Sequence, residues 1–186
     1  MIVLQPTLFR IALVVSISVL SFWDAQAYLS KRAKTSKDVG PALATCDRKP
    51  KGSEAWKECL GNARVEMSDA ELFYAGYWLA KSGQYETALT YLYLTRNKNE
   101  KVLTYIGYAT RKLGDVEKAI PYYAEALTKN PNYVVARAYL GEAYLTRGKP
   151  NLAKGQLQEI KERCGVSCPS YKDLELHISD YLSAHG

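Results

Sequence analysis

The sequence predicts an all-α protein, in which three helix–turn–helix hairpins stack into a solenoid and a C-terminal helix caps the stack. Three observations support this: a pattern that recurs every 31–34 residues, a helix-start signal before its first copy, and glycines at the expected turns. The 186 residues are 47% hydrophobic and 24% charged, which suits one domain with a short appendage. Tyrosine is unusually frequent, with 15 copies against 3 Phe and 3 Trp.

Residues 1–27 have the organisation of a cleavable signal peptide. Arg10 precedes a mostly apolar run from Ile11 to Phe22, and Ala25-Gln26-Ala27 fits an A-x-A cleavage site. As a helix the run would be about 18 Å long, short of the ~30 Å hydrocarbon core of a bilayer. We therefore expect cleavage after Ala27 and a periplasmic or secreted protein. Retention of the segment as a membrane anchor is the alternative.

Residues 28–45 form a basic leader. The stretch 28–44 has neither a helical nor a strand period, and it carries Lys31, Arg32, Lys34 and Lys37. We interpret the leader as a flexible, solvated segment. Weak association of residues 28–44 with the cell envelope, through anionic lipid or polymer, is the alternative.

Four cysteines would enter an oxidising compartment on export: Cys46, Cys59, Cys164 and Cys168. An even number of cysteines predicts two disulfides, and four cysteines allow three pairings. The spacing favours Cys46–Cys59 and Cys164–Cys168, because each pair brackets one short segment. A redox-active Cys164–Cys168 dithiol is the alternative. Redox motifs favour two intervening residues rather than three, so we expect a structural role.

The repeated pattern occupies residues 67–164. Each copy places a Gly two residues after a Tyr, a second Gly seven residues later, and an Ala five residues after that. The copies are Tyr74, Gly76, Gly83 and Ala88; Tyr105, Gly107, Gly114 and Ala119; and Tyr139, Gly141, Gly148 and Ala153. A Gly inside a helix costs about 1 kcal/mol relative to Ala, so we expect a neighbouring helix to press against the first Gly. The second Gly is expected to end the helix in a left-handed turn.

Local signals place several helix ends. Ser68 to Glu71 is a capping box, which predicts the start of the first repeat helix. Asp115 is expected to cap the return helix of the second copy, and Pro150 suits the first turn of the third return helix. Asn130-Pro131 is expected to close the second copy, because proline disfavours helical angles in the residue before it.

These residues resemble the signature of the tetratricopeptide repeat (TPR) family. The second copy matches it at Leu103, Ile106, Gly107, Gly114, Ala119, Tyr123, Ala126 and Pro131. The third copy departs from it with Arg137 at the large-aromatic position and Ile160 at the late small position. The first copy lacks the closing proline and is three residues short near residues 97–99. The ending Cys-Gly-x-x-Cys-x-x-Tyr, from Cys164, further looks like a group of exported alphaproteobacterial TPR proteins.

Residues on either side of the repeats are expected to cover the ends of the stack. The cysteine-bracketed segment 46–66 would pack on the first repeat through Trp56 and Leu60. Residues 165–186 would form a capping helix, held by the Cys164–Cys168 bridge and started by a capping box at Ser170–Asp173. Its apolar stripe is Tyr171, Leu174, Ile178 and Tyr181 with Leu182, and its polar outer face is Asp173, Glu175, His177 and Asp180.

The resemblance implies that the first helix of each pair lines a concave, Tyr-rich groove that binds a partner. The groove positions are Phe73, Tyr77, Lys101, Thr104, Tyr108, Arg111, Lys112, Glu142 and Leu145. Tyr and Arg are enriched at binding hot spots, which favours this surface. We expect Tyr74, Tyr105 and Tyr139 to pack between helices, because they recur at one register position.

The sequence contains no catalytic motif of the H-E-x-x-H or G-x-S-x-G type, and His177 and His185 have no second metal ligand nearby. We therefore predict no catalytic residues, no metal and no cofactor. The net charge of +6 is not accompanied by a nucleic-acid recognition module. The predicted function is that of an exported, non-catalytic, monomeric scaffold for an unidentified protein or peptide. A thiol–disulfide oxidoreductase using Cys164 and Cys168 is the alternative.

Overall fold

The structure is a computed structural model that describes residues 46, 48–50, 53–62 and 67–185. The predicted signal peptide and basic leader lie outside the described residues. The described helices are α2 (Glu54–Asn62), α3 (Asp69–Lys81), α4 (Tyr85–Leu94), α5 (Glu100–Lys112), α6 (Val116–Lys129), α7 (Val134–Thr146), α8 (Pro150–Cys164) and α9 (Pro169–His185). Among these described helices, none is long and apolar enough to cross a membrane.

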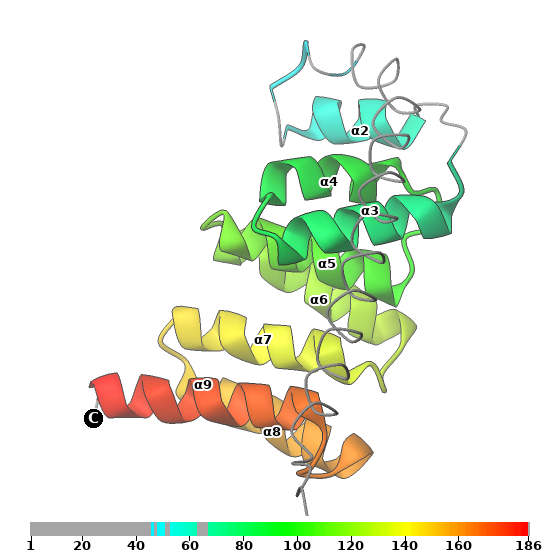
Figure 1. Cartoon of the computed structure of the whole chain (residues 1–186). Coiled ribbons are helices and arrows are strands. Elements are labelled where there is room, and N and C mark those ends of the chain that lie inside the picture. Colours follow the sequence, from blue (N-terminus) through cyan, green and yellow to red (C-terminus); the bar gives the residue numbers. More distant parts are fainter. Residues whose placement is uncertain (1–45, 47, 51–52, 63–66, 186) are drawn as a thin grey trace, which may run out of the picture.

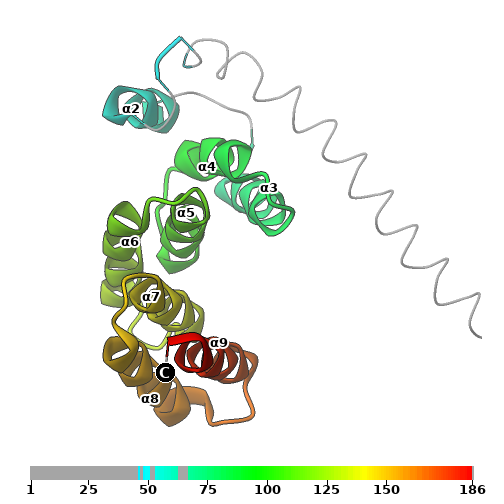
Figure 2. The ribbon, with the colours of Figure 1, turned by 90° about the vertical axis from the view of Figure 1, so that its left-hand side faces the viewer.

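The helices pair into three antiparallel hairpins, α3–α4, α5–α6 and α7–α8, which stack one on the next (Figure 1). Seen from the side in Figure 2, the stack curves, and α3, α5, α7 and α9 lie along its inner side. Helices α4, α6 and α8 form the outer layer. The predicted all-α helical-repeat solenoid is confirmed, and no strand is present in the described part of the chain.

The glycines inside the first helices are sites of close helix packing, as predicted. A Cβ atom built on Gly107 would lie 2.7 Å from Cε1 of Tyr123, on the return helix α6. A Cβ on Gly76 would lie 2.6 Å from Cγ of Leu92 on α4. At Gly141 the neighbour is different: the atom 2.6 Å away is Cδ2 of Leu174, on the capping helix α9. The third hairpin therefore uses its glycine to seat the cap.

The helix ends follow the predicted signals, with one exception. Ser68 and Glu71 form the capping box of α3, the Asp115 carboxylate caps α6, and Pro150 occupies the first turn of α8. The glycines that end α3, α5 and α7 have positive φ angles, 97° at Gly114, as a left-handed turn requires. The predicted capping box at Ser170–Asp173 is wrong, since α9 begins at Pro169. Proline fits the first helical turn because its missing N–H is not needed there.

Helix α2 covers the outer layer of the first hairpin. It packs on α4. Trp56 and Leu60 are 2% and 0% exposed, and the Trp56 ring lies 5.8 Å from the Tyr93 ring, edge to face. A disulfide joins Cys46 to Cys59 in this segment. A buried ring of the size of Trp56 removes a large apolar area from water, which stabilises the packing of this short helix.

The junction after the first hairpin is held by a carboxylate in place of the missing proline. Asp69 accepts hydrogen bonds from the backbone N–H groups of Arg96 and Asn97, at 2.9 and 2.7 Å. The Lys98 ammonium donates to the carbonyl of Tyr93 at 3.0 Å. The Asn99 side chain then caps α5. These bonds fix the turn of residues 95–99, which is one residue longer than the later junction at residues 130–133. The three missing residues of the first copy are therefore not lost near residues 97–99: α4 has 10 residues where α6 has 14.

We expect replacement of Asp69 by Ala to lower the free energy of unfolding by no more than about 1 kcal/mol near neutral pH, since the carboxylate is partly exposed. Although burial opposes it, hydrogen bonding from Arg96 and Asn97 lowers the pKa of Asp69 below 3.8. The carboxylate therefore stabilises the fold above that pH, and the difference between variant and wild type should shrink as pH falls below it. Urea unfolding at pH 7 and pH 3 measures this. A difference that grows in acid would contradict the role of Asp69.

Arg137 and Ile160, the two residues of the third copy that depart from the TPR pattern, both help to hold the third hairpin together. Instead of an aromatic ring, Arg137 places a guanidinium between α7 and α8. It donates to the Pro131 carbonyl at 2.9 Å and forms an ion pair with Glu159 at 3.1 Å. Ile160 is fully buried on α8. This hairpin is thus joined by one polar bridge and one large aliphatic side chain.

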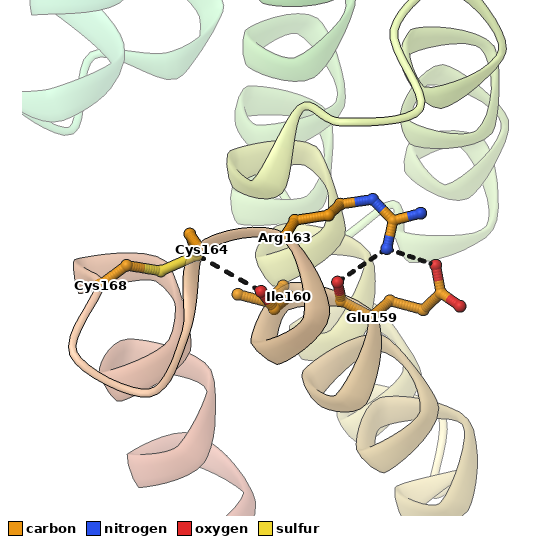
Figure 3. The surroundings of a disulfide bond; sticks show 5 residues. All are labelled: Glu159, Ile160, Arg163, Cys164 and Cys168. Atoms are coloured by element: carbon orange, nitrogen blue, oxygen red, sulfur yellow. Dashed lines mark hydrogen bonds and ion pairs between the residues drawn. A yellow bond between two sulfur atoms is a disulfide. The ribbon is translucent and has the colours of Figure 1, made fainter.

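A second disulfide joins Cys164, at the end of α8, to Cys168, directly before α9 (Figure 3). Both cysteines pack against a core cluster that contains Ile160 and Leu174. Cys164 Sγ also lies 3.4 Å from the Ile160 carbonyl. In Figure 3 the Arg163 side chain extends away from the sulfurs and pairs with Glu159. The disulfide therefore ties the cap to the last repeat within packed apolar surroundings.

Candidate binding surface

An aromatic ladder runs along the inner side of the stack. We use this name for Phe73 and Tyr77 on α3, Tyr105 and Tyr108 on α5, and Tyr139 on α7. The ring centroids of Tyr77 and Tyr105 are 4.8 Å apart, as are those of Tyr108 and Tyr139. Phe73 lies 5.9 Å from Tyr105. Aromatic contacts at these distances add to the energy of area burial, so the ladder links three successive hairpins.

The ladder is only partly covered by other groups. Tyr105 is buried, whereas the other four rings are half-buried and reach the surface. The expectation that Tyr105 and Tyr139 pack between helices agrees with their ring contacts. The same expectation for Tyr74 is wrong, because its side chain is 58% exposed. Tyr105 packs against the preceding first helix, α3, whereas α2 packs on α4, so that in the described part of the chain no first helix precedes Tyr74.

Tyr105, Tyr108 and Tyr139 of the ladder keep their hydroxyl protons at neutral pH. Burial raises the pKa of Tyr139 to about 12, and burial also raises the pKa of Tyr105 and Tyr108. A neutral phenol presents a hydrogen-bond donor and acceptor at the edge of an apolar ring. The half-buried rings thus offer both apolar area and polar groups to a bound chain.

Three cations surround the ring of Tyr108. The Lys112 and Lys81 ammonium groups lie 5.7 and 5.9 Å from its centroid, and the Arg111 guanidinium carbon lies 5.9 Å from it. Lys81 and Lys112 are exposed, and each stands in the last turn of its helix. Cations at these distances are attracted to the ring face and favour a helix C-terminus. The inner surface is therefore positive where α3 and α5 end.

One of these three cations, Arg111, belongs to a buried ion pair. Arg111 donates to Glu142 at 2.5 Å, and the two side chains are 9% and 13% exposed. Burial disfavours the charge on Arg111, but the Glu142 carboxylate and the Tyr123 side chain together outweigh burial and raise the pKa of Arg111. The pair connects α5 to α7 across the stack. Its charges cancel, so Lys112 supplies the net charge of this region.

A pocket of about 420 Å³ opens between α5, α7 and the capping helix α9. The residues that line it are Arg111, Lys112, Glu142, Leu145, Thr146, His177, Tyr181 and His185. His177 Nε2 is 3.9 Å from Glu142 Oε1. The His185 ring stacks on Tyr181 with centroids 4.2 Å apart. The pocket lies in the size range of small-ligand sites.

The structure places the predicted groove residues in four different settings. Phe73, Tyr77 and Tyr108 belong to the ladder, while Arg111, Lys112, Glu142 and Leu145 line the pocket. Lys101 is exposed in the first turn of α5, at the opposite end of that helix from Lys112. Thr104 is fully buried, and its hydroxyl donates to the Glu100 carbonyl at 2.6 Å. Thr104 therefore packs between helices and offers no surface to a partner in this structure.

Sequence reasoning missed the contribution of α9 to the inner side. The prediction that His177 belongs to an outward polar face is wrong, because it faces Glu142 of α7 and lines the pocket. The signal was available: His177, Tyr181 and His185 follow one another at intervals of four residues, which places them on one helix face. Leu174 and Ile178 of the predicted apolar stripe are both buried, as predicted.

Among the described residues, no three His, Cys, Asp or Glu side chains gather in a way that could hold a metal ion. The described inner surface combines aromatic rings, cations and the pocket beside α9. These groups provide contact area and hydrogen bonds.

The comparison with curated proteins gives no match. Residues 111–175, from the end of α5 into α9, match the family described as Tetratricopeptide repeat. Such repeats generally mediate protein–protein interaction and are typically found in non-catalytic scaffolds. The match supports the TPR resemblance over the second and third hairpins and the start of the cap.

Proposed function

We propose that this chain is an exported, non-catalytic scaffold that binds a segment of another protein along its inner surface. The observation that carries this proposal is the aromatic ladder, whose half-buried rings extend over three hairpins. Large rings held between helices lose little conformational entropy when a partner covers them. Stacked hairpins also present a continuous curved surface, which suits an extended segment better than a small substrate.

The proposed export rests on two features of the sequence and one of the structure. Residues 1–27 have the pattern of a cleavable signal, and the four cysteines form an even set. The structure joins these cysteines in two disulfides, which persist in oxidising compartments such as the periplasm. We infer a periplasmic or secreted protein that acts as a monomer. The basic leader 28–44 would add at most weak envelope association.

A scaffold role for Cys164–Cys168 is favoured over thiol–disulfide exchange. Both cysteines are half-buried and pack against an apolar cluster, and the bond connects two helices that also contact each other directly. A structural disulfide has a reduction potential below about −300 mV, and a catalytic one lies higher, near −120 to −200 mV. Measurement of this potential therefore separates the two roles.

The double variant Tyr77→Ala/Tyr108→Ala tests the proposed function. We expect it to reduce capture of the partner by at least about tenfold, because hot-spot aromatic residues each contribute about 2 kcal/mol or more. The measurement is quantitative mass spectrometry after mild crosslinking of the mature protein in periplasmic extract.

The matched control is Tyr74→Ala/Tyr171→Ala, which also removes two tyrosines, neither of them in the ladder. Its capture should equal that of the wild type. Circular dichroism of both variants must show the same helix content and similar melting. Equal capture by wild type and ladder variant would remove the aromatic ladder from the binding surface.

A further inference from the structure

Helix α3 presents two exposed aromatic rings at the N-terminal end of the stack. Tyr74 and Trp78 stand one turn apart on the same face of the helix, and they are 58% and 47% exposed. We use the name end face for these two side chains. Residues 72–80 of α3 carry no charged side chain, so the end face is surrounded by uncharged residues of its own helix. The Tyr74 ring contacts Phe73 and the Trp78 ring contacts Tyr77, so the end face lies directly beside the ladder.

The same two positions are buried in the second hairpin. Tyr105 and Ala109 of α5 occupy them there, and they are 6% and 0% exposed. The Tyr105 ring packs against α3, the first helix of the preceding hairpin, with its centroid 4.8 Å from that of Tyr77. In the described part of the chain no first helix precedes α3, and Figure 2 shows α2 beside α4. The end face therefore occupies a place where this fold buries side chains.

The size of Trp78 indicates what kind of segment fits over the end face. Ala109 and Ala143 stand at the equivalent positions of α5 and α7, and both are fully buried. The spacing between packed helices depends on the side chains at their contact, so a small side chain allows close approach. An indole at this position keeps another helix at a distance but offers a broad apolar surface. A thin, extended segment suits that surface better than a further repeat helix does.

The sequence directly before Cys46 has the composition and the length for this place. Residues 39–44 are Val-Gly-Pro-Ala-Leu-Ala and carry no charge, and they lie outside the described residues. Cys46 is 1% exposed and bonded to Cys59 of α2, which fixes this part of the chain at the N-terminal end of the stack. Helix α3 lies two helix spacings from α2, or about 20 Å, with α4 between them. The step from Val39 to Cys46 reaches about 23 Å when extended.

We propose that residues 39–44 of the leader lie across Tyr74 and Trp78 and cover the inner layer of the first hairpin, as α2 covers its outer layer. Pro41 has no N–H group, so it can pack on an aromatic ring without burying an unpaired donor. The basic residues 31–37 would then remain in water beyond the covered rings. They would give this end of the stack the polar outer surface that the end of a repeat array needs. This inference goes beyond the proposed function, because it concerns the chain's own leader and requires no partner.

The indole N–H signals test the proposal in the chain that begins at Tyr28. This chain contains two tryptophans, Trp56 in the core and Trp78 on the end face, and Trp78→Phe assigns their NMR signals. In Val39→Ser/Leu43→Ser we expect the Trp78 signal to shift. A soluble paramagnetic agent should also broaden it more than in the wild type, because the ring loses its apolar cover. The Trp56 signal should stay unchanged.

Lys34→Gln/Lys37→Gln is the matched control in the leader. It also changes two leader residues, but both lie outside residues 39–44, so neither indole signal should move. The reciprocal variant is Tyr74→Ala, which should shift the backbone amide signals of residues 39–44. Leu176→Ala removes a side chain of similar exposure, 60%, at the other end of the stack, and it should leave these amide signals unchanged.

Three results would overturn the proposal. The first is an unchanged Trp78 signal in Val39→Ser/Leu43→Ser. The second is an equal shift in Lys34→Gln/Lys37→Gln, which would assign the contact to the basic part of the leader. The third is a Trp78 signal that moves with protein concentration in the wild type, which would show that a second copy of the chain covers the end face. None of these measurements involves a captured partner, so their outcome is separate from that of Tyr77→Ala/Tyr108→Ala.

Discussion

Replacement of Glu142 by Gln is expected to lower the free energy of unfolding by about 3 kcal/mol. The Arg111 guanidinium would stay buried between α5 and α7 after losing its counter-charge, and the desolvation of an unpaired charge is costly. Urea unfolding followed by circular dichroism measures the change. We further expect the double variant Arg111→Met/Glu142→Leu to recover most of the stability, because it removes both charges and keeps the volume.

Glu117→Gln is the matched control for this prediction. Glu117 pairs with Arg147 at 2.7 Å, but these side chains are 69% and 34% exposed. An exposed pair of this kind contributes less than about 1 kcal/mol, because water screens the charges before and after the change. If Glu117→Gln and Glu142→Gln lower the free energy of unfolding equally, burial does not increase the contribution of the Arg111–Glu142 pair to stability.

Replacement of Leu174 by Ala should have an effect of similar size, a loss of about 3 kcal/mol. Leu174 is fully buried and fills the space above Gly141, where α9 meets α7. The loss combines the removed apolar area with the cavity left beside the glycine. The control is Leu176→Ala on the same helix, whose side chain is 60% exposed and whose loss should change stability by about 0.5 kcal/mol or less.

A double-mutant cycle with Gly141→Ala makes the prediction sharper. In the wild type the added methyl group would meet Leu174 Cδ2 at 2.6 Å, so the single change is destabilising. In Leu174→Ala the same methyl group enters the vacated space and should restore part of the lost stability. Additive effects of Gly141→Ala and Leu174→Ala would contradict the contact between the two residues.

The fold could be predicted because its signals are local and repeated. Gly107 inside a helix indicates close helix packing, and Gly114 at the end of that helix indicates a left-handed turn. Both glycines recur in three copies at similar intervals, which excludes coincidence. Caps such as Ser68 and Asp115 involve side chains within a few residues of the groups that they bind. Such features depend little on tertiary context, so sequence reasoning locates them well.

The candidate site was less predictable because its groups meet across hairpins. Arg111 and Glu142 lie on different hairpins, 31 residues apart, and pair only because α5 and α7 pack side by side. Thr104 has the right register for the inner side, but its small side chain remains below the larger rings beside it and bonds to its own helix. The polarity of α9 alone predicts that His177 belongs to the outer face of the capping helix. The curvature of the stack brings that face toward α7.

The position of α9 has a consequence for proteins built on the same plan with different numbers of hairpins. It packs on α7 and α8 as the first helix of another hairpin would, and its imidazoles reach the inner wall from there. Insertion of one more hairpin before α9 would move those imidazoles one step away from Tyr108. The number of repeats therefore sets the distance along the inner surface between the Tyr108 ring and the imidazoles of α9.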